Sequence, residues 1–435
     1  MARLASDYRA VRSVTRSLAA ALSPEDQMVQ SCPEASPVKW HQAHTTWFFE
    51  TFLLRPFLVN YKPFHEEFRR LFNSYYNSLG VQISGKPLRA CLSRPRLDEI
   101  LAYRAHVDEA METLLSARIG DEAARLLLLG LHHEQQHQEL LLTDIKHAFF
   151  QSPLHPAYEL APLAAQTSVP VSDLAWHKFN GGLVEIGLTP SARNALEFCF
   201  DNETPRHRVY LEPFLLANRA VTCREYLDFL ADDAYSRPEF WLSEGWDAVN
   251  TQGWEAPLYW ERDTTDETGW RVFTLRGWHS LGGLLDTPVC HVSHFEADAF
   301  ARWRGCRLPT EAEWEFAAYG RTVHGNLLDS GRLHPAKPHG RGLEQLFGDC
   351  WEWTSSAYCA YPGFQPLPGP LGEYNGKFMS GQMVLRGGSC ATPASHVRAA
   401  YRNFFHPATR WQFSGLRLAS SVSSSNQPWL PPCRP

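Results

Sequence analysis

Apolar residues recur at helical spacing through the first 150 residues of the chain. The pattern covers residues 3 to 22, 40 to 58, 64 to 79, 97 to 118 and 121 to 150, with Pro or Gly between several of these runs. Apolar positions three and four residues apart place their side chains on one face of a helix. We therefore expect a bundle of helices, and residues 1–150 form the first expected domain.

The pattern changes after a proline-rich segment. Residues 151–173 (QSPLHPAYELAPLAAQTSVPVSD) carry few charges and are expected to be a linker. From residue 174 on, short runs typical of strands, such as LVEIGL, HRVYL and MVLRGG, alternate with long loops rich in turn residues. We expect residues 174–420 to fold as an irregular α+β domain and residues 421–435 to be a tail, so the fold class of the chain is α+β.

Composition narrows the class of function. The chain has 435 residues, of which 44% are hydrophobic, so it can form two or three domains with sizeable cores. A net charge of −6 gives no reason to expect a nucleic acid or an acidic membrane surface as partner, and no stretch is long and apolar enough to cross a bilayer. The ten cysteines are scattered without a C-x-x-C pair, which favours free thiols in a reducing compartment and predicts a cytoplasmic protein.

The sequence LHHEQQHQEL, residues 131 to 140, contains the H-E-x-x-H pattern found in zinc peptidases. His133 and His137 are four residues apart, and on a helix this spacing places both imidazoles on one face, about 6 Å apart, where they can bind one metal ion. A catalytic metal needs a third ligand. In a peptidase, Glu134 would be the general base. However, Leu140 and Thr143 occupy the positions of the Gly and the third His of the extended motif, which weakens the peptidase interpretation. Two solvated histidines on a polar face are the alternative.

Several separated strings mark the second domain. RLPTEAEWEFAAYG, FGDCWEWTSS, VLRGGS and FSGLRLA occur in this order. Together they resemble the formylglycine-generating-enzyme-like, or sulfatase-modifying-factor, fold, an irregular α+β arrangement of C-type-lectin type. Thr310 and Glu313 also have the spacing of a helix capping box, so the first string has a purely structural explanation as well. Cys390 alone follows the RGGS turn, whereas the copper-dependent oxidases of this fold use a pair of cysteines there, so that oxidase activity is not expected.

The first domain carries a second resemblance. SPVKWHQAHTTWFFETFLL and LHHEQQHQELLLTDIKH are similar to the DinB-like four-helix bundle that precedes this second domain in the sulfoxide synthases of ergothioneine biosynthesis. The resemblance implies that His44 joins His133 and His137 as ligands of a non-haem Fe(II). Three neutral imidazoles leave other coordination positions open for substrates. His41 could share the face of His44 and is expected as a residue that supports the ligands from behind; it is ranked below His44 only by the resemblance. His132 is a rival donor, but as the neighbour of His133 on a helix it should point to a different face.

The resemblance also implies the substrates. It predicts an enzyme that uses O2 to join the sulfur of cysteine to C2 of Nα-trimethylhistidine and oxidises that sulfur. By the motif of the family, Gln136 contacts the imidazole or carboxylate, and Asn403 and Phe404 provide polar and aromatic contacts, since aromatic faces attract a trimethylammonium group. A solvated Gln136 and a Phe404 that packs in a core are the alternatives. An ovothiol-type histidine–cysteine sulfoxide synthase and a non-catalytic metal-binding module are the rival functions.

Two departures from the family's pattern affect the predicted site. Leu371 of GPLGEY stands where a catalytic tyrosine is expected, and this segment keeps Tyr374. We therefore predict that Tyr75 or Tyr76 of LFNSYYNSLG is the proton donor, with core packing as the alternative. The closely spaced arginines that bind γ-glutamylcysteine in other members are missing, so we expect free cysteine as the sulfur donor and Arg94 as the partner of its carboxylate.

Overall fold

The computed structural model describes residues 2–74, 76–79, 86–117, 119–163, 171, 173–189, 197–340 and 342–422. The chain forms two compact units. One, the helical unit, comprises residues 1–159 together with 189–202 and 364–377. The other, the mixed unit, comprises residues 160–188, 203–363 and 378–435. The helical unit thus takes in two segments that follow the predicted linker, a grouping that the linear division of the sequence does not contain.

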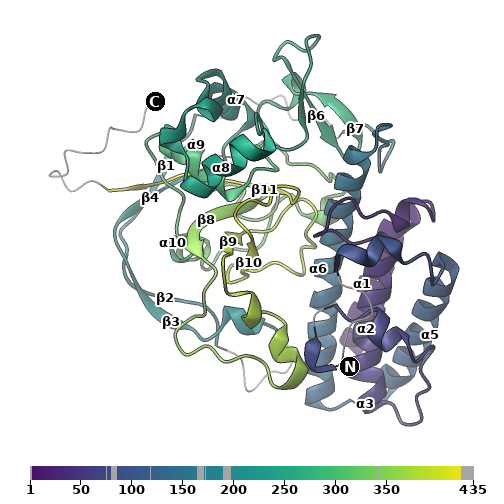
Figure 1. Cartoon of the computed structure of the whole chain (residues 1–435). Coiled ribbons are helices and arrows are strands. Elements are labelled where there is room, and N and C mark those ends of the chain that lie inside the picture. The colour runs from purple at the N-terminus through teal and green to yellow at the C-terminus, as the bar shows by residue number, and fades with distance from the viewer. Residues whose placement is uncertain are drawn as a thin grey trace. The chain divides into compact units, whose positions relative to one another are not determined.

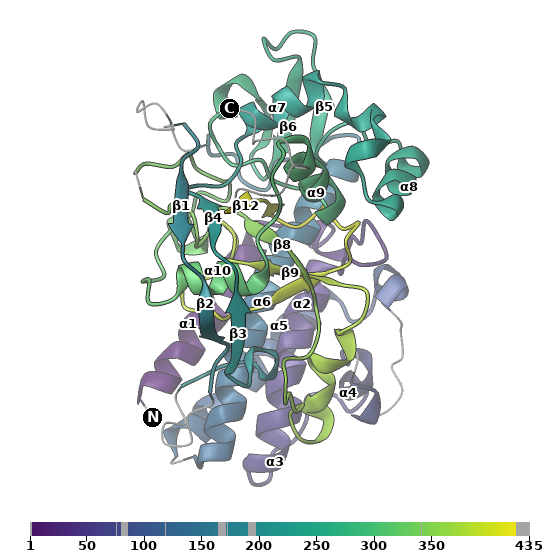
Figure 2. The ribbon, with the colours of Figure 1, turned by 90° about the vertical axis from the view of Figure 1, so that its left-hand side faces the viewer.

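The helical unit is a four-helix bundle (Figures 1 and 2). Its long helices lie side by side and are α1 (Ala2–Ala20), α2 (Val38–Phe49), α5 (Leu97–Ser116) and α6 (Asp121–Gln151). Helix α2 continues through a π-helical turn, Glu50–Leu54, into the short α3 (Arg55–Phe57). Four of the five predicted helical runs therefore correspond to these elements, because each has an apolar face that a neighbouring helix covers.

Gly130 allows α6 to approach α2 closely. A Cβ atom at this position would lie 2.7 Å from the Phe49 ring and 3.0 Å from the Phe48 ring. Both rings are fully buried, so there is no open space into which they could move. A glycine in the middle of a helix costs stability, and here it is explained by the packing that brings the two helices together.

The predicted helix over residues 64 to 79 is wrong as a continuous element: the described residues contain only the α-helical turn α4 (Phe68–Leu71) and a 3-10 turn, Asn77–Leu79. A continuing helix would need a bond from the amide of Tyr76 to the carbonyl of Phe72. Instead, the Tyr76 amide donates to Oδ1 of Asn73 at 3.1 Å, and the Phe72 carbonyl accepts from Nδ1 of His44 at 2.6 Å. A local side-chain bond and a tertiary contact therefore replace the helical bond.

The described residues of the mixed unit form four small sheets. The first has the order β1 (Trp176–Phe179), β4 (Phe214–Ala217), β12 (Ala419–Ser421), and the second the order β10 (Asn403–Phe405), β9 (Met383–Arg386), β8 (Trp351–Ala357), β11 (Ser414–Gly415). A hairpin-like pair joins β2 (Gly182–Ile186) and β3 (His207–Leu211), and the last sheet holds β5 (Trp260–Arg262), β6 (Trp270–Thr274) and β7 (Gly277–Ser280). All paired strands are antiparallel except β8 and β11. The predicted strand runs LVEIGL, HRVYL and MVLRGG lie on β2, β3 and β9.

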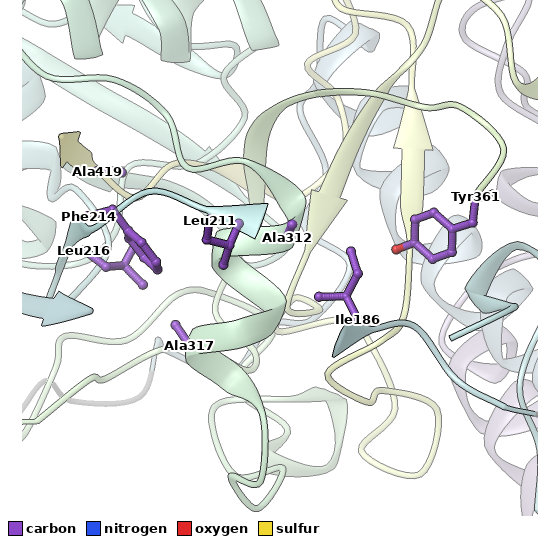
Figure 3. Packing of buried hydrophobic residues seen from close by; sticks show 8 residues of the cluster. All are labelled: Ile186, Leu211, Phe214, Leu216, Ala312, Ala317, Tyr361 and Ala419. Atoms are coloured by element: carbon purple, nitrogen blue, oxygen red, sulfur yellow. The ribbon is translucent and has the colours of Figure 1, made fainter. Parts of the chain in front are cut away.

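Short helices complete this unit: α7 (Cys223–Ala231), α8 (Ser243–Gln252), α9 (His294–Trp303) and α10 (Glu311–Ala318). Helix α10 packs its alanines against strand residues in one core cluster (Figure 3), made of Ile186, Leu211, Phe214, Leu216, Ala312, Ala317, Tyr361 and Ala419. The helix begins at the predicted capping box. Oγ1 of Thr310 accepts from the Glu313 amide at 3.1 Å, and the Glu313 carboxylate accepts from the Thr310 amide at 2.8 Å.

Two further expectations can be compared with the described residues. None of the nine cysteines among them forms a disulfide, in agreement with their scattered positions in the sequence. Across the same residues, none of the helices combines the length and the apolar character that crossing a bilayer requires. The confirmed fold class is α+β, with the helical bundle first in the chain.

Candidate metal centre

Three histidines from two helices converge inside the helical unit. His44 comes from α2, and His133 and His137 come from successive turns of α6. One ring nitrogen of each can be chosen so that all three lie within 4.8 Å of one another. Within the part of the chain that the structure describes, this is the one group of His, Cys, Asp and Glu side chains with the spacing of a metal site. The i, i+4 pair predicted from the sequence thus meets the third residue that the resemblance implied.

The ring of His44 is held on both sides. It stacks between Trp40, at 4.5 Å between ring centres, and Trp47, at 5.4 Å, with interplanar angles of 14° in both cases. Its Nδ1 donates to the Phe72 carbonyl at 2.6 Å, which places the proton on Nδ1. The buried Nε2 has no hydrogen-bond partner among the described residues, so its lone pair is available to a metal ion.

The other two rings are held differently. His133 is buried and packs against Phe48 at 4.8 Å between ring centres, and neither of its ring nitrogens has a hydrogen-bond partner among the described residues. His137 bonds through Nδ1 to Nδ1 of His41 at 2.8 Å. Orphaned nitrogens in a buried site cost free energy unless a ligand satisfies them. The donor set therefore fits a metal ion.

Electrostatics favour neutral imidazoles here. Burial, with a smaller contribution from the charge of His133, holds the pKa of His44 well below its usual value. Burial likewise lowers the pKa of His133 to about 3, although the neighbouring Glu134 opposes this. Burial and the neighbouring His133 and His44 lower the pKa of His137 well below its usual value. Each ring therefore keeps a lone pair at neutral pH, as metal binding requires.

Glu134, the glutamate of the H-E-x-x-H pattern, is not placed to act as a general base. It is fully buried, and its carboxylate accepts from Arg12 at 3.0 Å and from Arg104 at 3.1 Å. Burial alone would raise its pKa, but the two arginines outweigh burial and lower the pKa to about 2. A general base must reach a water molecule and hold a proton near neutral pH. This geometry excludes the zinc-peptidase interpretation and assigns Glu134 a structural role.

The segment 364–377 brings a tyrosine to the histidines. Tyr374 packs edge-on against His133 at 5.8 Å between ring centres and stacks on Phe200 at 5.5 Å. Its hydroxyl donates to Oε1 of Gln136. The preceding Glu373 fastens the segment to the bundle, because its carboxylate accepts from the amides of residues 77 and 78 at 3.0 and 2.9 Å. Gln136 is therefore an ordered residue beside the metal centre.

The remaining predicted residues lie in different surroundings. Tyr76 is fully buried against Trp47, at 5.4 Å, and Phe52, and Tyr75 lies outside the described residues. Asn403 and Phe404 belong to β10 of the mixed unit. There Phe404 stacks on Tyr358 at 4.0 Å, and the Asn403 side chain accepts from the amide of residue 404.

His132, expected on another face, stacks on Phe198 at 4.1 Å.

Arg89 is a residue that sequence reasoning missed. Arg94, the predicted carboxylate partner, is exposed, whereas Arg89 is 3% exposed and lies over the Trp40 ring at 3.5 Å. Its charge contributes to lowering the pKa values of His44 and His137, after burial and the neighbouring histidines. Both arginines occur in one short stretch without helical periodicity, so the sequence holds no signal that distinguishes the buried one.

Comparisons with known proteins agree with this architecture. The DinB superfamily model matches residues 7–141, and the sulfatase-modifying factor enzyme 1-like domain matches residues 178–338 and 333–422. Hercynine oxygenase from Mycolicibacterium smegmatis is 32% identical over 90% of this chain and 92% of its own length, and the protein of that name from Mycobacterium tuberculosis has the same identity and coverage. A formylglycine-generating enzyme from Streptomyces coelicolor is 31% identical over 51% of this chain and 82% of its own. The chain therefore belongs to the hercynine oxygenase family, and it is an oxidoreductase.

Proposed function

We propose that this enzyme binds iron(II) through His44, His133 and His137 and uses O2 to join the sulfur of cysteine to C2 of Nα-trimethylhistidine (hercynine), as a sulfoxide synthase of ergothioneine biosynthesis. The imidazole loses its C2 hydrogen and the thiol loses its proton as the carbon–sulfur bond forms, which is a two-electron oxidation. Oxidation of the sulfur to the sulfoxide removes two more electrons. One atom of O2 enters the sulfoxide and the other leaves as water, so the four electrons balance.

The convergence of three neutral imidazoles, those of His44 and His133 buried and that of His137 half-buried, is the observation that carries the proposal. Their ring nitrogens lie within 4.8 Å of one another, and relatives that match nine-tenths of the chain are hercynine oxygenases. When bound, iron(II) supplies activation of O2 and a coordination position for the thiolate. Neutral imidazole ligands leave the charge of the ion uncompensated, which favours a thiolate over a neutral thiol.

We assign Gln136 to the imidazole or carboxylate of the trimethylhistidine. Its Oε1 is occupied by the hydroxyl of Tyr374, and its amide nitrogen can then donate to a substrate acceptor. Tyr374 is thus a positioning residue for Gln136, because its own proton is engaged in that bond. Asn403 and Phe404 remain the proposed contacts of the trimethylammonium end, since an aromatic face attracts such a cation.

Arg89 replaces Arg94 in our proposal as the partner of the cysteine carboxylate. A guanidinium that is nearly buried loses part of its hydration and therefore binds a carboxylate more strongly than an exposed one. Arg89 already contacts Ser36 and Ser74 through hydroxyl oxygens, at 2.7 and 3.0 Å. Its guanidinium is therefore held in place beside Trp40. γ-Glutamylcysteine would bring a further carboxylate, so we expect cysteine to be preferred.

Tyr75 and Tyr76 remain the proposed proton donors. Tyr76 is separated from the bulk solvent and shares the Trp47 ring with His44. A phenol in a water-free site can supply a proton without admitting competing hydrolysis. The role of the donor is to steer oxidation towards the carbon–sulfur bond and away from cysteine sulfinic acid.

The test is anaerobic reconstitution with Fe(II), followed by exposure to O2 with trimethylhistidine and cysteine and by mass spectrometry and NMR of the product. We expect one iron per chain and a sulfoxide bonded at C2. A parallel reaction with histidine tests the ovothiol type, which would place sulfur on another ring carbon. Absence of both product and O2 consumption in an iron-loaded sample would overturn the enzymatic proposal and leave a metal-binding module.

Variants sharpen this test. His44→Ala should abolish stoichiometric iron binding, because it removes one of three ligands. His147→Ala is the matched control on α6. This ring bonds to Oγ of Ser31 at 2.7 Å and lies outside the ligand group, so iron binding should persist. Full activity in His44→Ala would contradict the three-histidine assignment.

A further inference from the structure

A second layer of buried polar groups lies behind one of the three histidines. Nδ1 of His41 is 2.8 Å from Nδ1 of His137, and Nε2 of His41 is 3.1 Å from Oδ2 of Asp144. His41 is 2% exposed and Asp144 is 5% exposed. The same Asp144 oxygen accepts from the Ser36 amide at 2.8 Å, which anchors the carboxylate to the start of α2.

The chain of contacts places each proton. A carboxylate oxygen accepts a hydrogen bond, so Nε2 of His41 must carry the proton that it donates to Asp144. In a neutral imidazole the other nitrogen then carries a lone pair, and Nδ1 of His41 is an acceptor. Nδ1 of His137 must therefore be the donor in the contact between the two rings. The remaining nitrogen of His137, Nε2, is left with its lone pair.

We propose that Asp144 and His41 are positioning residues that hold His137 in the tautomer protonated on Nδ1, and that this pair sets the affinity of the site for its metal ion. The inference rests on the metal site of the proposed function. His41, which the sequence presented as a possible supporting residue on the face of His44, thus acts behind His137. The charge of Asp144 also pulls the intervening protons towards itself, which makes the His137 nitrogen a better electron donor.

The three proposed ligands are oriented by different means. For His44, the Phe72 carbonyl holds the proton on Nδ1, so His44 and His137 both offer Nε2. His133 has no hydrogen-bond partner among the described residues and is held by packing against Phe48. Among the described residues, His137 is the one of the three with an anionic group behind it. Loss of the Asp144–His41 pair should therefore weaken metal binding, whatever it does to the stability of the bundle.

The first measurement uses the metal-free full chain. Nitrogen NMR of the [15N]histidine-labelled protein distinguishes the two neutral tautomers by the shifts of their ring nitrogens. The His137 signal can be identified by its loss in His137→Asn. We expect His137 to be protonated on Nδ1 in the wild type. Protonation on Nε2 would overturn the proposal without any bearing on whether the enzyme is active.

The second measurement is the dissociation constant for Fe(II), obtained anaerobically by competition with a chromogenic chelator. His41→Phe removes the acceptor, and we expect binding to weaken by about 10- to 100-fold. His41→Asn places an amide oxygen near the position of Nδ1 and should recover most of that loss. Asp144→Asn keeps a neutral acceptor in place of the carboxylate and should weaken binding by roughly threefold to tenfold, since charge-assisted bonds are the stronger ones.

A matched control separates metal binding from folding. Gln42 lies on the same helix, is 1% exposed and bonds to Gln27 at 2.7 Å, and neither residue is among the ligands. Gln42→Leu should leave Fe(II) affinity within about twofold of the wild type, whatever its effect on apo-protein stability. Equal Fe(II) affinity in wild type and His41→Phe would refute the positioning role. A wild type that binds no Fe(II) would instead refute the proposed function.

Discussion

Replacing Glu134 by Gln should destabilise the helical unit strongly, although the substitution changes neither volume nor shape. The amide keeps one oxygen as an acceptor but loses the negative charge between Arg12 and Arg104, whose distances to the carboxylate are 3.0 and 3.1 Å. Both arginine side chains are nearly buried, at 4% and 6% exposure. Removal of one partner from a buried ion pair typically costs about 3–5 kcal/mol, because the remaining charge is left uncompensated. Arg12 keeps a second partner in Asp108, at 2.7 Å, so the uncompensated charge is chiefly that of Arg104.

The pKa of Glu134 gives a second value for the loss of unfolding free energy in Glu134→Gln. The two arginines, working against burial, lower the pKa from an ordinary 4.5 to about 2. At about 1.4 kcal/mol per pKa unit, the ionised form contributes roughly 3 kcal/mol to stability. Because the folded-state pKa is lowered, this contribution is complete above pH about 4.5 and is lost as the pH falls towards 2. The free-energy loss expected from the broken ion pair and the loss expected from the pKa therefore agree in order of magnitude.

Urea unfolding of the metal-free protein, followed by far-ultraviolet circular dichroism, measures the effect chiefly in the unit that contains the long helices. We expect Glu134→Gln to lose roughly 3 kcal/mol at pH 7 and the difference from wild type to shrink at pH 3. Glu109→Gln, the same change at an exposed position of α5, should cost under about 0.5 kcal/mol. If Glu134→Gln were as stable as this control at pH 7, the reasoning about the buried carboxylate would be refuted.

The remaining predictions concern packing, pH and product choice. Gly130→Ala should lower the free energy of unfolding by about 1–3 kcal/mol, because its Cβ would lie 2.7 Å from the buried Phe49 ring, and an unchanged melting temperature would contradict this. Burial, opposed by hydrogen bonds, raises the pKa of Asp349 to about 6, so its ionisation penalises folding above that pH and not below pH 3.8. Asp349→Asn should therefore raise the melting temperature at pH 8 but not at pH 3.5, and Asn also suits the φ of 58° at this position. Tyr374→Phe should raise KM for trimethylhistidine by about fivefold to tenfold with product ratios unchanged, through loss of one hydrogen bond. Tyr76→Phe, alone or combined with the same change at the preceding tyrosine, should keep O2 consumption but shift product towards cysteine sulfinic acid; unchanged ratios would move the donor role to Tyr374.

The sequence pattern predicted the structure correctly where that structure depends on residues close together in the chain. The long helices follow from apolar spacing, and the capping box that begins α10 follows from Thr310 and Glu313 alone. The alignment of His133 and His137 on one face of α6 follows from the helical repeat. The helix predicted over residues 64 to 79 failed because two of its backbone groups are bonded elsewhere, one of them to the ring of His44.

The helical bundle, the strand-rich second part and the pair of histidines on one helix face followed from the order of residues in the chain, and the resemblance supplied the third histidine. Three facts came from the folded chain alone: Glu134 forms ion pairs with two arginines, Arg89 is buried while Arg94 is exposed, and the hydroxyl of Tyr374 bonds to Gln136. These outcomes depend on which distant segments exclude water from a group. Periodicity reports the direction of a side chain from its own helix, whereas burial, ion pairing and pKa depend on what packs against it.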